Sequence, residues 1–157
     1  MTPEQAQDLK QLLQRQDLAA LGTLHRGEPF VSMVPYALLA DGRLVIHVSQ
    51  LATHTRDMQE HPGVSVMVLG ERAADSLPQE QPRASLQGEA HRCEPDAPDH
   101  AAARQAYLAR FPHSEPMFGF GDFSLFLVTP RSVRFVAGFA QAFSLTGPDY
   151  GALMGSG

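Results

Sequence analysis

The sequence contains no tryptophan, one cysteine and one lysine among its 157 residues. Because Cys93 is alone, an internal disulfide and a cluster of thiolate metal ligands are both excluded. No apolar run reaches the about 18 residues that a membrane-spanning helix needs. The first residues, Met1–Gln5, are polar and do not resemble a signal peptide. We therefore expect a soluble, cytoplasmic protein with no membrane partner.

Positive charge is also scarce. Lysine and arginine together number 12 against 17 aspartate and glutamate residues, which gives a formal net charge of −5. An acidic chain is repelled by a phosphate backbone, so we expect no nucleic-acid partner. The chain is 43% apolar, which at this length suffices for a core without a disulfide or a metal. We expect one domain over residues 1–146 and a loose tail over residues 147–157, where glycine and proline recur.

Strand signals follow one another through most of the chain: residues 83–90 alternate, residues 64–69 are rich in β-branched side chains, and Asp41-Gly42 is typical of a hairpin turn. A helix is expected first, because Thr2, Pro3 and Gln5 suit a capping box with proline at the first helical position. We expect helices over residues 2–16, within 49–61 and over 101–111, strands over 19–25, 30–38, 43–48, 64–69, 83–90, 123–128 and 132–136, and a loop over 70–82. This order predicts a mainly β, antiparallel barrel with flanking helices.

The segment from His47 to Arg56 passes from a predicted strand into a predicted helix. It contains hydroxyl groups, a new helix N-terminus and one arginine. Free helix N–H groups and a guanidinium fork are the donors that a phosphate group needs. The alternative is a plain helix cap followed by a surface arginine.

Two other segments could contact a flat ring. In residues 32–36, Pro35 cannot donate to a sheet, so neighbouring backbone groups could bond a heterocycle; the alternative is a protected edge strand. In residues 135–143, Gly138 permits close approach between aromatic neighbours; the alternative is a final core strand with a glycine bulge.

Several common catalytic motifs are missing from the sequence. It has no G-x-S-x-G, no P-loop and no G-x-G-x-x-G, which argues against the usual hydrolases, nucleotidases and dinucleotide-binding enzymes. His54 and His61, with Asp57 between them, could share a helix face as metal ligands, but a solvated face is the stronger interpretation, and we expect no metal. Cys93 is expected to be structural.

Four stretches in this order resemble the FMN-binding split-barrel family related to pyridoxamine 5′-phosphate oxidase. They are Gly22–Leu24 with Pro29–Tyr36, Leu51–Met58, Pro82–Ala90 with its Gln87-Gly88, and Arg134–Ala142. The similarity runs from about Leu9 to Phe143 and is closest to the branch that includes haem-utilisation oxygenases. The resemblance implies a six-stranded antiparallel split β-barrel that forms a homodimer, with FMN at the dimer interface.

The resemblance also implies a set of cofactor contacts. Ser32, Met33, Val34, Pro35 and Tyr36 would line the isoalloxazine ring, partly through their backbone. Ser49, His54, Thr55 and Arg56 would hold the phosphate group. Gln87 would reach the flavin from its strand, and Gly138, Phe139 and Gln141 would approach from the partner subunit.

The function that the resemblance implies is an FMN-dependent oxidoreductase, which would use an electron donor and an unknown small-molecule substrate. The alternatives are a haem-binding or haem-degrading protein on the same scaffold, or a flavin-binding module without catalysis. Vitamin B6 oxidation is not expected, because the C-terminal segment lacks the arginine-rich end of that enzyme. No residue is assigned as a catalytic acid or base: Tyr36, His47 and His25 are the candidates, and each also suits a structural role.

Overall fold

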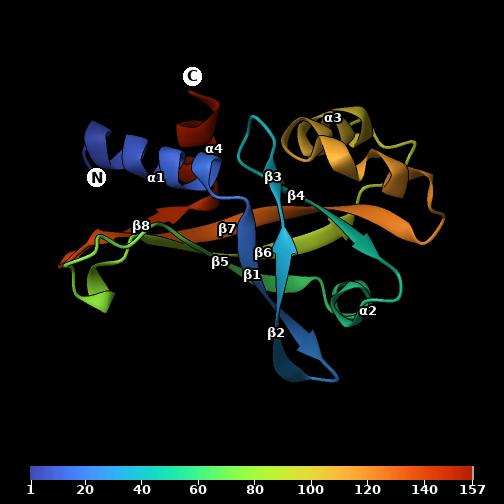
Figure 1. Cartoon of the computed structure of the whole chain (residues 1–157), viewed down its shortest axis with the longest axis horizontal. Coiled ribbons are helices and arrows are strands. Elements are labelled where there is room, and N and C mark those ends of the chain that lie inside the picture. The colour runs from blue at the N-terminus through green and yellow to red at the C-terminus, as the bar shows by residue number, and fades with distance from the viewer. Residues whose placement is uncertain (157) are drawn as a thin grey trace.

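The computed structural model describes residues 1–156, and antiparallel strands dominate it (Figure 1). Eight strands form one sheet in the order β2-β1-β5-β6-β7-β4-β3, with β8 also paired to β7. The strands are β1 (Leu18–His25), β2 (Glu28–Pro35), β3 (Ala37–Leu38), β4 (Leu44–Ser49), β5 (Gly63–Leu69), β6 (Arg83–Arg92), β7 (Phe123–Gly138) and β8 (Gln141–Thr146). The mainly β, antiparallel prediction is confirmed, with eight strands in place of six.

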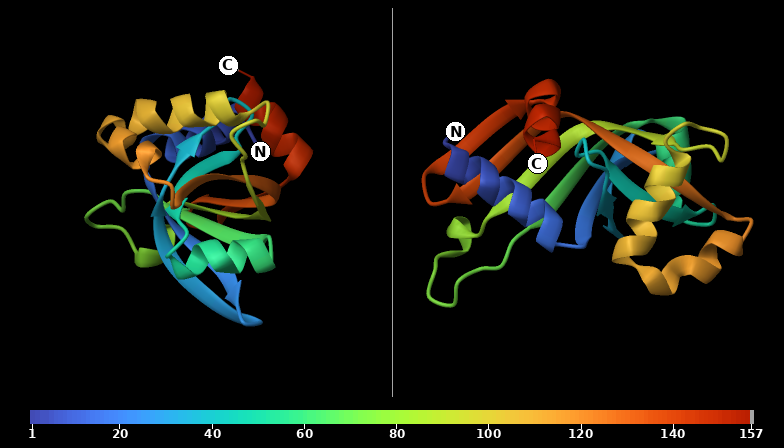
Figure 2. Two further views of the ribbon diagram at one scale, coloured as in Figure 1. Left: turned by 90° about the vertical axis from the view of Figure 1, so that its right-hand side faces the viewer. Right: turned by 90° about the horizontal axis from the view of Figure 1, so that it is seen from above.

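Helices lie around the curled sheet at three places (Figures 1 and 2). The helices are α1 (Pro3–Arg15), α2 (Thr53–Glu60), α3 (His100–Arg110) and α4 (Gly147–Gly155), with short 3₁₀ helices η1 (Pro78–Glu80) and η2 (Pro112–Gly119). Helices α1 and α4 lie together above β7 and β8, and α3 with η2 lies above the other end of the sheet. Helix α2 lies on the opposite side, next to β1. No helix among residues 1–156 is long and apolar enough to span a membrane.

Two apolar clusters form the core. The larger one joins α1 and α4 to the inner face of the sheet and includes Leu9, Leu21 and Phe135. The smaller one lies beneath α3 and includes Val45, Tyr107 and Leu127. Strand β7 contributes to both clusters, because alternate side chains of its first half point to opposite faces of the sheet: Phe126 and Val128 belong to the larger cluster, and Leu125 and Leu127 to the smaller one. Its first half pairs with β4 and its second half pairs with β8. This 16-residue strand therefore connects the two ends of the molecule.

A bulge bends the central pair of strands. The register of β6 on β7 shifts between Gln87 and Gly88. A Cβ atom at Gly88 would overlap the main-chain carbonyl of Thr129, so only glycine fits this close approach. The bulge lies in the middle of the sheet and contributes to its curl.

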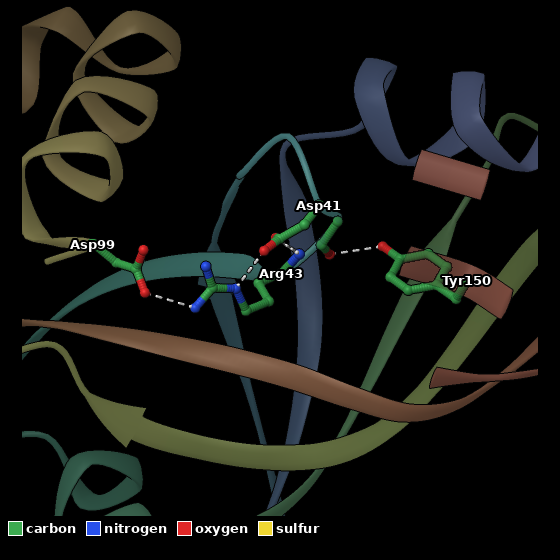
Figure 3. Close-up of polar contacts among 5 residues, drawn as sticks. Asp41, Arg43, Asp99 and Tyr150 are labelled. Carbon is green, nitrogen blue, oxygen red and sulfur yellow. Dashed lines mark hydrogen bonds and ion pairs between the residues drawn. The ribbon is translucent and has the colours of Figure 1, made fainter. Parts of the chain in front are cut away.

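The turn between β3 and β4 is held from two sides (Figure 3). Arg43 pairs through Nε with Asp41 at 2.8 Å and through Nη1 with Asp99, before α3, at 3.0 Å. From the other side, the Tyr150 hydroxyl of α4 donates to the Gly42 carbonyl at 2.8 Å. Gly42 has φ of 86°, which favours glycine.

The structure corrects the prediction for the C-terminal residues. Residues 147–155 form α4 instead of a loose tail. Thr146 caps this helix by accepting from the Asp149 amide, Pro148 suits its first turn, and the side chains of Tyr150 and Met154 are buried. The glycine content had suggested a loose tail, but the two buried side chains, Tyr150 and Met154, are enough to hold the helix against the core. The strands expected over residues 123–128 and 132–136 are one strand, β7, and β8 was not predicted.

Candidate functional site

Two residues predicted to contact a cofactor meet where α2 lies against the β1–β2 hairpin: His54, expected to hold the phosphate group, and Ser32, expected to line the ring. The His54 imidazole, in the first turn of α2, lies 3.2 Å from the Ser32 hydroxyl of β2. We call this region the α2 corner and define it by His25, Ser32, His54 and Asp57. These residues share one face because β1 and β2 are in register, with Leu21 opposite Ser32 and His25 opposite Glu28.

A buried carboxylate holds the imidazole of His25. Asp57, only 2% exposed, accepts from the Thr23 hydroxyl at 2.9 Å and lies 2.8 Å from His25 Nδ1. A carboxylate can only accept, so Nδ1 carries a proton in this pair, and the tautomer that fits it has its lone pair on Nε2. The His25 side chain is 41% exposed. The arrangement presents one oriented, accessible imidazole.

The second imidazole of the corner is held in its neutral form. His54 is half-buried, and burial lowers its pKa, although the Asp57 charge acts in the opposite direction. A lowered pKa leaves His54 uncharged at neutral pH. Asp57 faces β1 and bonds Thr23 and His25, so it does not bridge His54 and His61 as a shared helix face would require.

Of the other residues predicted to hold a phosphate group, Ser49 and Thr55 make structural hydrogen bonds, whereas Arg56 is accessible. Thr55 is buried and donates to the Ser49 carbonyl at 2.6 Å, while the Ser49 hydroxyl donates to Asp122 at 3.1 Å. Both hydroxyls thus hold the loop before α2. Arg56 is exposed. Ala52, at the N-cap of α2, provides no side-chain hydrogen bond, and its carbonyl accepts from the Thr55 amide at 3.2 Å. The amides of Thr53 and His54 are left for another acceptor.

The segment expected to line a flavin alternates between the core and the surface. Ser32, Met33 and Pro35 are accessible, whereas Val34 and Tyr36 are buried. Tyr36 donates its hydroxyl to Leu13 and its amide to Asp17, and its carbonyl accepts from Arg110. Burial raises the pKa of Tyr36 to about 12. Its side chain therefore belongs to the core, and an acid–base role does not suit it.

Gln87 lies in a shallow groove on the outer face of the sheet. The groove measures about 680 Å³, and its lining combines polar residues such as Ser85 and Arg134 with apolar residues such as Val31 and Met67. Gly138, Phe139 and Gln141 lie at the turn between β7 and β8, at the end of the sheet away from α2 (Figure 1). Within one chain these three residues are therefore separated from the α2 corner.

The edge of the outer face is apolar. Leu18, Val31, Met33, Met67 and Leu69, on β1, β2 and β5, are 40–68% exposed. Neighbouring exposed apolar side chains of this size mark a surface that another molecule covers. We call these five residues the apolar edge.

Sequence reasoning missed the role of Asp57 as the partner of His25. The two residues are 32 positions apart, and no local motif joins them. One signal was available: His25 is in phase with Leu21 and Thr23, which are buried on alternate positions of β1. This alternation places His25 on the inner side of the hairpin. The sequence does not show that α2 packs there, because that packing is a tertiary contact.

Comparison with known proteins extends this description. A model of the pyridoxamine 5′-phosphate oxidase family matches residues 6–137. The chain belongs to this family. Among the curated members of the wider group, the chloroplastic heme oxygenase HOZ of Arabidopsis thaliana is 37% identical over 126 residues, which cover 80% of this chain and 37% of HOZ. The heme oxygenase HutZ of Vibrio cholerae is 27% identical over 146 residues, covering 90% of this chain and 81% of HutZ.

A solved structure with a name that also refers to haem has the same fold as this chain. The heme binding protein of Mycobacterium smegmatis superposes with a TM-score of 0.86 at 32% identity, over 97% of this chain and 62% of that protein. The split-barrel prediction and the resemblance to the haem-utilisation branch are both confirmed. The chain spans 37% of the length of HOZ and 62% of the mycobacterial protein.

Proposed function

We propose that this member of the pyridoxamine 5′-phosphate oxidase family binds haem, with the α2 corner providing the iron ligand. The observation that carries the proposal is the contact between His25 and the buried Asp57, at 2.8 Å. The names of HOZ, HutZ and the mycobacterial protein, all of which refer to haem, support it. The FMN-dependent oxidoreductase has no such support among these relatives.

The chemistry of His25 fits an iron ligand. Metal-bound histidines usually donate their second ring nitrogen to a carboxylate or carbonyl, which fixes the ring and strengthens the ligand. His25 has this bond through Nδ1, and its partially exposed ring leaves Nε2 accessible. Asp57 is held in turn by Thr23 at 2.9 Å, so the imidazole rests on a rigid support.

The surroundings of His25 also fit a large apolar ring system. The Phe30 ring lies 5.8 Å from the His25 ring, and Phe30 is 40% exposed. The neutral His54 lies across the corner, and Arg56 on α2 can pair with an acidic substituent. When bound, haem supplies an iron centre for ligand binding and one-electron chemistry. The chain's own part is to hold the imidazole, present apolar surface and exclude water.

The apolar edge supports a second part of the proposal, that two copies of the chain form a homodimer. Five exposed apolar side chains on β1, β2 and β5 would be buried by a symmetric partner. Because Gly138, Phe139 and Gln141 lie far from the α2 corner of their own chain, they can contribute to a ligand site only from the other subunit.

Haemin titration tests the proposal. We expect a shifted Soret band that survives gel filtration, and we expect His25→Ala to weaken binding by about tenfold or more because the iron loses its ligand. His91→Ala, at an exposed histidine of β6, is the matched control and should bind as the natural protein does. Failure of the natural protein to retain haem would refute the function. Undiminished binding by His25→Ala would refute only the ligand assignment.

FMN is the second candidate ligand, and one observation favours it. The N-terminus of α2 has no side-chain cap, and Arg56 is exposed in the same turn, so a phosphate group could accept from both. The corresponding function is an oxidoreductase that takes electrons from a donor and acts on an unknown small molecule. Gel filtration after addition of FMN distinguishes the two candidates, because a retained flavin spectrum without haem retention supports the oxidoreductase.

A further inference from the structure

A second cavity shares no lining residue with the outer-face groove or with the α2 corner. It is enclosed by α3, η2, the end of β6 and the β4–β7 pair, and it measures about 550 Å³. This volume is within the usual range for small-molecule sites. We call it the α3 pocket and define it by His47, Arg92, His100, Arg104, Phe118 and Phe123.

Flat rings form the inner wall of the α3 pocket. The His47 imidazole stacks on Phe118 with ring centroids 3.9 Å apart and an angle of 8° between the planes. Phe123 lies 5.2 Å from the same imidazole. Aromatic walls of this kind favour an occupant that is itself a flat ring, because such rings stack face to face or edge to face.

Cations surround the mouth of the pocket. The cations are Arg92 and Arg104, and they line the pocket against a single carboxylate, Glu115. Arg92 is 3.5 Å from Glu94, an exposed and weak pair. The Arg104 guanidinium lies over the Phe118 ring at 5.1 Å, and no acidic group of residues 1–156 lies within 4.0 Å of it. Its donors are therefore left for an anion that lies on the same aromatic wall.

One polar atom of the wall lacks a partner. His47 Nδ1 is buried and makes no hydrogen bond within the part of the chain that the structure describes. Burial lowers the pKa of His47 to about 4, so the ring is neutral at pH 7. Because Nδ1 itself has no surface open to the pocket, an occupant can bond the imidazole only at its other ring nitrogen, Nε2, and the histidine in this way suits an occupant with a hydrogen-bonding group of its own.

We propose that the α3 pocket binds a small aromatic carboxylic acid that also carries a hydroxyl group. Its ring lies against Phe118 and Phe123, its carboxylate pairs with Arg104, and its hydroxyl bonds the His47 imidazole. A bidentate guanidinium–carboxylate pair is the strong, directional contact that would select an acid over a neutral ring. The site is independent of haem, because its lining residues are all outside the α2 corner.

Titration of the isotope-labelled protein with 4-hydroxybenzoate, followed by NMR, tests the proposal. We expect saturable shifts at residues 92–95 and 118–125. We expect affinity about tenfold lower for Arg104→Gln and for the neutral probe 4-hydroxybenzamide, since each loses the ion pair. Arg131→Gln is the matched control: Arg131 is also exposed but lies on β7 outside the pocket, and its loss should change nothing. Arg104 is exposed, so its replacement leaves the core intact.

Three results would overturn the proposal. One is the absence of saturable shifts up to about 20 mM of the acid, a concentration at which even millimolar sites fill. Another is equal affinity for the acid and the amide, which would show that the charge is not recognised. The third is unchanged affinity in Arg104→Gln. Benzoate completes the series, because the hydroxyl contact requires that it bind more weakly than 4-hydroxybenzoate.

Discussion

His25, His47 and His54 show how three chemically identical side chains acquire different properties from their neighbours. His25 is oriented by a buried carboxylate, His54 is neutral because it is half-buried, and His47 is stacked in an aromatic wall with one nitrogen unsatisfied. From the sequence alone, two of them, His25 and His47, were candidates for a catalytic acid or base and for no other specific role. Their roles depend on residues that come close only after folding.

At the scale of single residues, we predict that His47 makes the protein less stable in acid. Its folded pKa of about 4 is below the ordinary histidine pKa of 6.5, so between these values the unfolded chain binds more protons. The free energy of unfolding should therefore fall as the pH drops through this range. In His47→Phe this part of the fall should be missing.

Urea unfolding at several pH values between about 4 and 6.5 measures this contribution. The comparison is with His61→Gln, in which an exposed histidine is replaced. If the His47→Phe and natural proteins lose stability in parallel, the buried imidazole does not contribute to the acid sensitivity.

At the scale of elements, α4 shows what composition alone cannot predict. Glycine and small residues suggested a loose tail, yet Tyr150 and Met154 lie one turn apart and dock the helix on the core. The capping residue Thr146 was recognisable, and so was the first-turn Pro148. The sequence could not show the surface against which α4 packs, which includes the Gly42 carbonyl, 108 positions away from Tyr150.

We predict that a chain ending at Thr146 is strongly destabilised. Removal of α4 uncovers core that Tyr150 and Met154 cover, and losses of large buried side chains cost about 2–5 kcal/mol each. The milder variant Tyr150→Phe keeps the packing but loses the hydrogen bond to Gly42, which should cost about 1 kcal/mol. Thermal and urea unfolding measure both; a truncated chain as stable as the full one would show that α4 is dispensable.

The strand pairs illustrate the same division between local and distant information. The segments 19–25, 43–48, 64–69 and 83–90 were predicted as strands, and the structure places strands there with slightly different ends. The merging of two predicted strands into β7 was not predicted, because Pro130 between them has no N–H to donate to a neighbouring strand. In the sheet Thr129 and Pro130 lie opposite the Gly88 bulge, which accommodates the proline.

At the scale of the whole molecule, the predicted cofactor residues do not form one site within a chain. His54 and Ser32 meet at the α2 corner, Gln87 lies in the outer-face groove, and Phe139 lies at the far turn of the sheet. The resemblance supplied this list, and in the homodimer that we propose its members would come from two subunits.

We therefore predict that charge on the apolar edge separates the subunits. The double variant Val31→Glu with Met33→Glu should be a monomer in light scattering after gel filtration, because two carboxylates would be desolvated on each side of the interface. Leu77→Glu, at an exposed apolar residue in the loop before η1, is the control and should leave the dimer intact. A dimer that persists in the double variant would place the interface on another surface.

The pairing of β4 with β7 also has a consequence during synthesis. The hydrogen bond between Gln50 and Ser124 joins residues 74 positions apart, and β4 pairs with β7 over 74 positions (Ser49 with Phe123) to 84 positions (Leu44 with Val128). Because a ribosome adds about 5–20 residues per second, β4 emerges about 4–15 seconds before its partner. Leu44, Val45, Ile46 and Val48 are available to other nascent chains throughout this interval. The yield of this protein in a cell should therefore depend on how quickly it is translated and on whether a chaperone shields that one segment.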